Sequence, residues 1–129
     1  MQLVTDEIRE QLLANGRNRD QDHTPVVKFF SPVGAATWLI TEMDPEMPDL
    51  LFGLADLGFG CPELGDVSLR ELESITFLGG ALGIERDLHW TGEHPISVYA
   101  AISAKHGRLV DRPDPEEVKA VMAQRQAAG

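Results

Sequence analysis

The chain has 129 residues, 43% of them hydrophobic and 25% charged, which is the size and composition of one ordinary globular domain. Its 21 acidic and 11 basic residues give a formal net charge of −10, which disfavours direct binding to the phosphates of nucleic acid. Its apolar runs are too interrupted to span a membrane, and its single cysteine excludes an intrachain disulfide, so with no signal peptide we expect a cytoplasmic protein.

The negative charge is concentrated in the middle of the chain. Between Glu42 and Glu93 there are twelve acidic residues and two basic ones, whereas acids and bases balance at nine each elsewhere. Because unpaired carboxylates are rarely buried, we expect the acids early in this span to be exposed and to bind a partner. The predicted partner-binding residues are Glu42, Asp44, Glu46, Asp49, Asp56, Glu63 and Asp66.

The first half of the chain predicts one helix followed by strands. Thr5 is a favourable N-cap, and Asn15-Gly16 supplies the stop of a short amphipathic helix. After a polar loop, several runs are rich in β-branched and aromatic residues, with prolines and glycines at the turns between them. Strands are expected at residues 26–31, 37–41, 50–57 and 63–67. The short turns favour an antiparallel meander, whose third strand, apolar on both faces, is predicted to be central.

The second half of the chain predicts three helices and one more short strand. Ser68 and Glu71 form a capping box for the first helix, which we expect to end at residues 79–80. The limits of the second helix are marked by Pro95, which suits a first turn, and by Gly107, which follows the last turn. The remaining elements are expected at residues 84–90 for the strand, and at 95–107 and from 114 onward for the helices.

These elements predict an α+β fold in a single domain. Residues 1–107 are expected to form an antiparallel sheet, a meander of three to five strands, packed with about three helices. Residues 108–129 are expected to form an extension with a short C-terminal helix. The apolar stripe of that helix is narrow, consisting of Val118, Val121 and Met122, so we expect it to contribute little to the core.

The sequence carries no motif for a metal, a cofactor or a catalytic residue, and we predict none of the three. Asp87 and His89 would share one face of a strand, near Glu93 and His94, but their spacing matches no zinc or di-iron pattern. Cys61 lacks the local signature of a nucleophile and is interpreted as a small buried hydrophobe. Carboxylate pairs are unavoidable among so many acids, so they are a weak sign of acid–base chemistry.

The two tryptophans carry different expectations. Trp38 lies in a predicted strand and is expected to pack in the core. Trp90 precedes a turn that contains glycine, so for this residue the core and the wall of a pocket both remain open.

Several segments together resemble an uncharacterised bacterial family, the domain of unknown function numbered 2958. The segments are VKFF, TW-x-x-TE, FGL, ELG-x-VSL-x-EL and IERD-x-x-W, and the resemblance covers about residues 3–100. It implies a small, single-domain cytoplasmic protein of a kind frequently encoded on plasmids and other mobile elements. It implies no activity and no catalytic residue, and the tail after Gly107 extends beyond it.

Three functions remain open. We expect first a non-enzymatic protein that presents its acidic surface to a protein with a basic surface, such as a nucleic-acid-binding or host-defence protein. The alternatives are a small hydrolase-like enzyme that uses acids such as Glu85 or Asp87, and a structural accessory subunit. A pocket with converging carboxylates would favour the enzyme, whereas a solvated acidic surface would favour the binding protein.

Overall fold

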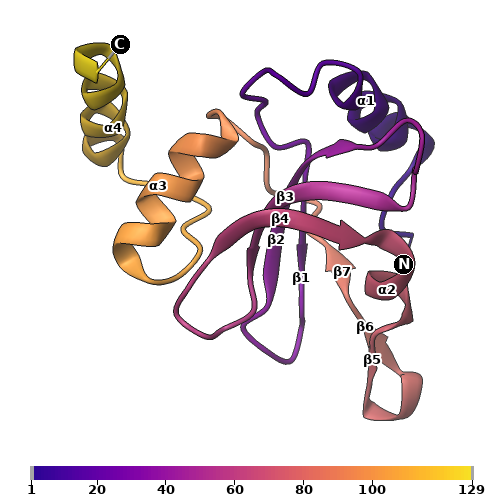
Figure 1. The fold of residues 1–129 in the computed structure, drawn as a ribbon. Helices are drawn as coiled ribbons and strands as arrows, with labels where there is room; N and C mark the ends of the chain where they lie inside the picture. The colour runs from indigo at the N-terminus through magenta and orange to yellow at the C-terminus, as the bar shows by residue number, and fades with distance from the viewer. Residues whose placement is uncertain (1, 129) are drawn as a thin grey trace.

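The computed structural model describes residues 2–128 and shows an α+β fold built on one five-stranded sheet, which confirms the predicted fold class (Figure 1). The strands are ordered β4-β3-β2-β1-β7, and every neighbouring pair is antiparallel. Their bounds are β1 Val27–Phe30, β2 Thr37–Met43, β3 Leu50–Asp56, β4 Glu63–Ser68 and β7 Glu85–Arg86. The middle strand is β2, and β3 lies inside the sheet between β2 and β4.

Helices lie around this sheet, and their starts follow the sequence signals. The helices are α1 Asp6–Gly16, α2 Leu69–Ser74, α3 Ile96–His106 and α4 Pro115–Ala128. Thr5 caps α1 by accepting from the N–H of Ile8 at 3.2 Å, and Gly107 ends α3 in the left-handed conformation with φ 69°. Within residues 2–128 no helix is long and apolar enough to cross a membrane.

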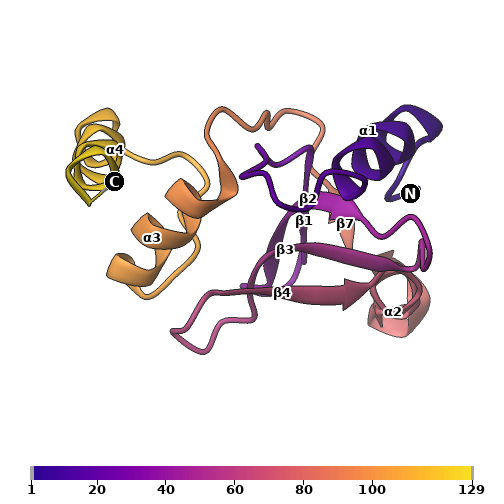
Figure 2. The same cartoon turned by 45° about the horizontal axis from the view of Figure 1, so that its top comes forward.

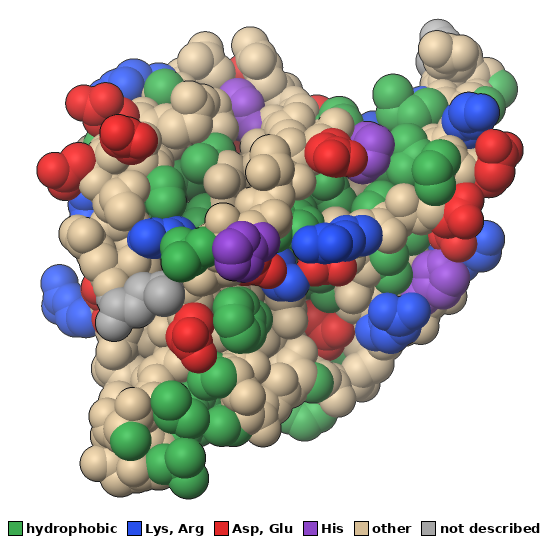
Figure 3. Space-filling model, turned by 180° about the vertical axis from the view of Figure 1, so that it is seen from behind, with side chains coloured by type: hydrophobic (Ala, Val, Ile, Leu, Met, Phe, Trp, Pro, Cys, Tyr) green, Lys and Arg blue, Asp and Glu red, His purple; other side chains and the backbone are tan. Residues whose placement is uncertain are grey.

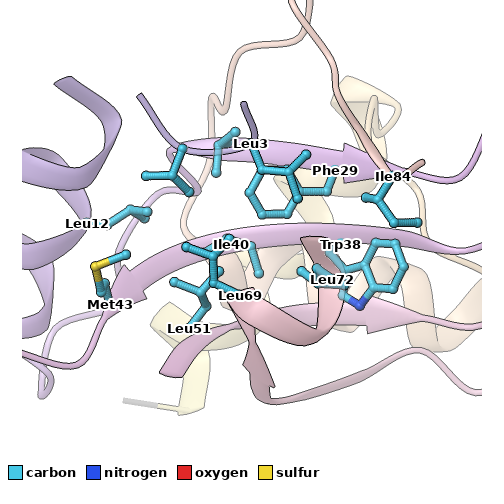
Figure 4. Packing of buried hydrophobic residues seen from close by; sticks show 12 residues of the cluster. Leu3, Leu12, Phe29, Trp38, Ile40, Met43, Leu51, Leu69, Leu72 and Ile84 are labelled. Atoms are coloured by element: carbon cyan, nitrogen blue, oxygen red, sulfur yellow. The ribbon is translucent and has the colours of Figure 1, made fainter. Parts of the chain in front are cut away.

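Two clusters of buried side chains fill the two faces of the sheet. Successive side chains of β2 point to opposite faces of the sheet, so Trp38 and Ile40 belong to one cluster and Leu39 belongs to the other. Figure 4 shows the larger cluster, to which α1 contributes Leu12 and α2 contributes Leu72. The smaller cluster packs α3 onto the opposite face through Tyr99, which is 1% exposed.

The helix that starts at Ser68 is shorter than predicted. It ends at Ser74, and the chain then forms a small projecting hairpin of β5 (Thr76–Phe77) and β6 (Leu82–Gly83), joined by the 3-10 turn η1 (Leu78–Gly80) (Figure 1). The run Ile75 to Phe77 is β-branched and aromatic, so it favours a strand over a further helical turn. Gly79 and Gly80, with φ of 68° and 94°, therefore make a hairpin turn and do not stop a helix.

The C-terminal helix α4 packs against α3, on the side of α3 away from the sheet (Figure 2). No side chain of α4 up to residue 127 is fully buried. His106 on α3 contacts the carboxylate of Glu117 at 2.9 Å, and Arg125 contacts Asp22 at 3.1 Å. The helix is thus held mainly at the surface.

Candidate functional site

The seven predicted partner-binding acids do not share one environment. Glu42 and Asp56 are only 6% and 7% exposed, so the expectation of exposure is wrong for both. Glu42 lies on β2, and its carboxylate accepts from the guanidinium of Arg19 at 3.0 Å. Asp56 ends β3 and accepts from the backbone N–H groups of Gly58 and Leu109, each at 2.8 Å. A carboxylate with such partners can be buried, and it is then unavailable to another protein.

Asp44 is half-buried and belongs to the turn between β2 and β3. Its carboxylate accepts from the N–H groups of Glu46 at 2.8 Å and Met47 at 3.2 Å, and it lies 3.5 Å from Arg19. The two N–H groups lie in a turn, where the carboxylate takes the place of a backbone carbonyl as their acceptor. Asp44 therefore shapes the turn, and its charge is partly neutralised by Arg19.

Asp49 links the same turn to the start of α2. It accepts from the hydroxyl of Ser68 at 2.6 Å and from the N–H of Arg70 at 2.8 Å. The Ser68 hydroxyl, followed by the Arg70 N–H, lowers the pKa of Asp49 below its usual value, so this carboxylate is ionised at neutral pH.

The remaining predicted acids are exposed, and two more acids on α2 join them. Glu63 and Asp66 lie on β4, which is the last strand at one edge of the sheet. Among residues 2–128 these side chains take part in no ion pair within 4.0 Å. We call this surface the acidic edge, and it consists of Glu46, Glu63, Asp66, Glu71 and Glu73.

A shallow hollow lies on the sheet beside the acidic edge. It has a volume of about 180 Å³, with Trp38 and Ile40 on one side and β4 on the other. Its floor is formed by Gly53 and Gly65, which face each other across β3 and β4. A Cβ at Gly53 would lie 2.0 Å from the carbonyl oxygen of Leu39, whereas a Cβ at Gly65 would meet open space. Sequence reasoning missed this hollow, although a glycine inside each strand was a usable signal.

A polar pocket of about 370 Å³ lies between the chain after β7 and the start of α3. Trp90 lines it and donates from its indole nitrogen to the carbonyl of Asp111 at 2.8 Å, and its ring lies 5.9 Å from that of Tyr99. Trp90 is 8% exposed, so it serves both the core and the pocket wall. Burial raises the pKa of Tyr99, more than the N–H groups of Glu93 and His94 lower it, so its hydroxyl stays neutral at neutral pH.

An ion-pair network joins β1 to the chain near this pocket. The ammonium of Lys28 lies 2.6 Å from Asp111 and 3.3 Å from Asp87. Burial raises the pKa of Asp87, but the His89 N–H, Lys28 and the Trp90 N–H together lower it by more, so the pKa lies below its usual value. Asp87 is therefore an ionised structural partner of Lys28.

Glu85 and Asp87, the two acids considered for an enzyme, do not converge. Glu85 lines a separate hollow of about 470 Å³ with Glu73 and Leu3, whereas Asp87 contacts Lys28. On the face seen from behind, acidic, basic and histidine side chains are interspersed, so neither sign of charge dominates there (Figure 3). Among the described residues no group of three or more His, Cys, Asp or Glu is arranged to hold a metal ion.

Cys61 is exposed, so its interpretation as a buried hydrophobe is wrong. It lies in the loop between β3 and β4, with its sulfur 3.9 Å from the carbonyl of Phe59. Phe59 itself is 83% exposed at the same loop, between Gly58 and Gly60, which both have positive φ. The glycines turn the loop so that an aromatic side chain projects into solvent.

Comparison with known proteins identifies a family and nothing more. The family described as "Protein of unknown function (DUF2958)" matches residues 3–110, which is most of the chain, and the protein belongs to this family. No curated protein and no solved structure matches the chain. The family description assigns no activity.

Proposed function

We propose that the protein is a non-enzymatic binding protein that presents its acidic edge to a protein with a basic surface. The observation that carries this proposal is the set of unpaired, exposed carboxylates on β4 and α2, at one open edge of the sheet. Charges arranged in this way speed the encounter with an oppositely charged partner and repel wrong ones. Because the resemblance implies a mobile-element setting, we propose a nucleic-acid-binding or host-defence protein as the partner class.

An exposed aromatic side chain beside the acidic edge supports the same reading. Phe59 is 83% exposed and Leu57 is 57% exposed in the loop that leads to Glu63. Binding energy at protein interfaces is concentrated in a few aromatic and apolar side chains, surrounded by polar ones. The loop is held in place by the two bonds of Asp56, so it presents Phe59 from a fixed base.

The alternative of a hydrolase-like enzyme has less support. The polar pocket contains Glu93 and Asp111, and Asp111 is held by Lys28 at 2.6 Å. The second acid considered, Asp87, has a lowered pKa, which suits a fixed ion pair better than a general acid at neutral pH.

The proposal is tested by capture from the native host with the purified protein as bait, at about 50 mM and about 300 mM salt. The matched baits are wild type, the double variant Glu63→Gln/Asp66→Asn, and a control, Glu10→Gln, which removes an exposed acid from α1. We expect a basic partner that is retained at low salt by wild type and control, and lost from the double variant. Association of the purified partner that is indifferent to salt and to the double change would contradict the proposal.

A further inference from the structure

The outer edge of β4 is open, and its protection comes from charge. Natural sheet edges are blunted by charged side chains, proline, bulges or very short strands. β4 has six residues, ELGDVS, with no proline and no lysine, and it pairs with β3 in continuous register from Leu50↔Ser68 to Ala55↔Glu63. The strand at the opposite edge, β7, has only two residues. The backbone of β4 is therefore free to bond another extended chain.

We infer that β4 takes up an extended, basic peptide segment of the partner by strand addition, with an apolar side chain of that segment seated in the hollow above Gly65. This inference rests on the proposed function and names the form of the partner. In strand addition, backbone hydrogen bonds supply affinity and side chains at alternate positions supply specificity. The hollow supplies such a position, because a neighbouring strand can place an apolar or aromatic side chain over a glycine.

Side chains of β4 point alternately to the two faces of the sheet, and this pattern defines the peptide sequence that would fit beside the strand. Glu63 and Gly65 face the side of the hollow, whereas Leu64 and Asp66 face the side of α3. Residues directly opposite each other on paired strands interact, and opposite charges are favourable. The incoming segment would therefore carry a basic residue opposite each of Glu63 and Asp66, with two apolar residues between them. This pattern reads the same in both strand directions.

Charge also disfavours some ways of pairing with a second copy of this chain. In the antiparallel registers that place Glu63, or Asp66, opposite the same residue of the other copy, two carboxylates would face each other. Like charges opposite each other on paired strands are destabilising. A basic segment meets no such repulsion.

The test uses a displayed library of random peptides of about twelve residues, selected on the wild-type protein at low salt. We expect enrichment of peptides with two basic residues separated by two apolar ones. A synthetic peptide of the enriched sequence should bind about tenfold more weakly to Gly65→Val, which fills the hollow, and be weakened less by Gly65→Ala. Both variants should keep the wild-type melting temperature or exceed it, because the added Cβ meets no atom within 4 Å and both residues favour a strand more than glycine does.

Backbone methylation of the synthetic peptide separates strand addition from simple charge attraction. In an added strand, alternate N–H groups point at β4, so methylating one alternate set should abolish binding and methylating the other should leave it. Absence of enrichment, equal binding to Gly65→Val, or indifference to both methylated peptides would overturn the inference.

The failure of this inference and that of the proposed function give different results. Binding that falls with salt and with Glu63→Gln/Asp66→Asn, but ignores Gly65→Val and methylation, would retain the acidic edge and reject strand addition. Binding that responds to Gly65→Val and methylation, but ignores salt and the double change, would retain strand addition to β4 and reject the basic partner. Binding changed by none of these would reject both.

Discussion

Asp56 illustrates at the scale of a single residue how a buried carboxylate organises a loop. One oxygen accepts from the N–H of Gly58 and the other from the N–H of Leu109, which ties the β3–β4 loop to the chain after α3. Asp56→Asn keeps the shape but leaves one of these N–H groups without an acceptor. We expect the free energy of unfolding, measured with urea, to fall by about 1–3 kcal/mol.

The matched control for this change is Glu46→Gln, which replaces an exposed carboxylate at the other end of β3. It should alter the free energy of unfolding by less than about 0.5 kcal/mol. An Asp56→Asn protein as stable as the control would show that the two bonds contribute nothing net to folding.

Asp87 makes stability depend on pH. Its folded-state pKa lies below the usual value of an aspartate, because the His89 N–H, Lys28 and the Trp90 N–H together outweigh the effect of burial. A lowered pKa contributes stability that is present above the unfolded-state pKa and is lost as the pH falls through the folded-state pKa. We therefore expect the difference in unfolding free energy between wild type and Asp87→Asn to be constant near neutral pH and to shrink below about pH 4. A difference that does not change with pH would contradict this.

At the scale of elements, Ser68 starts α2 and joins it to the preceding turn. Its hydroxyl oxygen accepts from the N–H of Glu71 at 3.1 Å, and its O–H donates to the carboxylate of Asp49 at 2.6 Å. Ser68→Ala should lower the free energy of unfolding by about 1 kcal/mol, the usual cost of losing a cap. The same change removes the main cause of the lowered pKa of Asp49, so NMR titration should show that pKa rising toward its usual value. An unchanged thermal melt would show that the cap is not needed.

The elements show which parts of the fold could be predicted from the sequence. Local signals were sufficient where a cap or a turn residue decides the outcome, as at Thr5, Ser68 and Gly107. The end of α2 was mispredicted: the β-branched and aromatic run Ile75 to Phe77 was a usable local signal, but its pairing with β6 is a contact that periodicity does not encode. The burial of Glu42 and Asp56 was missed for a similar reason. Their partners, Arg19 and the N–H of Leu109, lie 23 and 53 positions away.

The helix α4 is expected to be dispensable for folding. It packs on α3, none of its side chains up to residue 127 is fully buried, and it lies beyond the family match that ends at residue 110. Residues of both helices line a hollow of about 400 Å³, so the packing between them is incomplete. Truncation after Arg112 should leave a cooperative thermal transition. Its loss in the truncated chain would show that α4 completes the core or an oligomer interface.

At the scale of the whole molecule, the net charge is −10, and the acidic residues lie in two kinds of environment. Buried or half-buried acids have local partners: Arg19 neutralises Glu42 and Lys28 neutralises Asp111, whereas Asp56 accepts from two backbone N–H groups. The acids of the acidic edge have no such partner, so their mutual repulsion opposes folding of the compact state. The residues of the proposed binding surface are therefore also those whose repulsion lowers stability.

This arrangement predicts how salt changes stability. Screening acts on exposed charges and much less on buried pairs, so salt should relieve the repulsion along the acidic edge and leave the Lys28 network intact. We expect the melting temperature of the wild type to rise between about 10 mM and about 200 mM sodium chloride. In Glu63→Gln/Asp66→Asn the rise should be smaller and the melting temperature at low salt higher. In the control Glu10→Gln, which removes one acid from α1, the rise should be nearly that of the wild type. A wild-type melting temperature that falls with salt would mean that attractive surface ion pairs outweigh the repulsion between the acids. The acidic edge would then have no net repulsion for a basic partner to relieve.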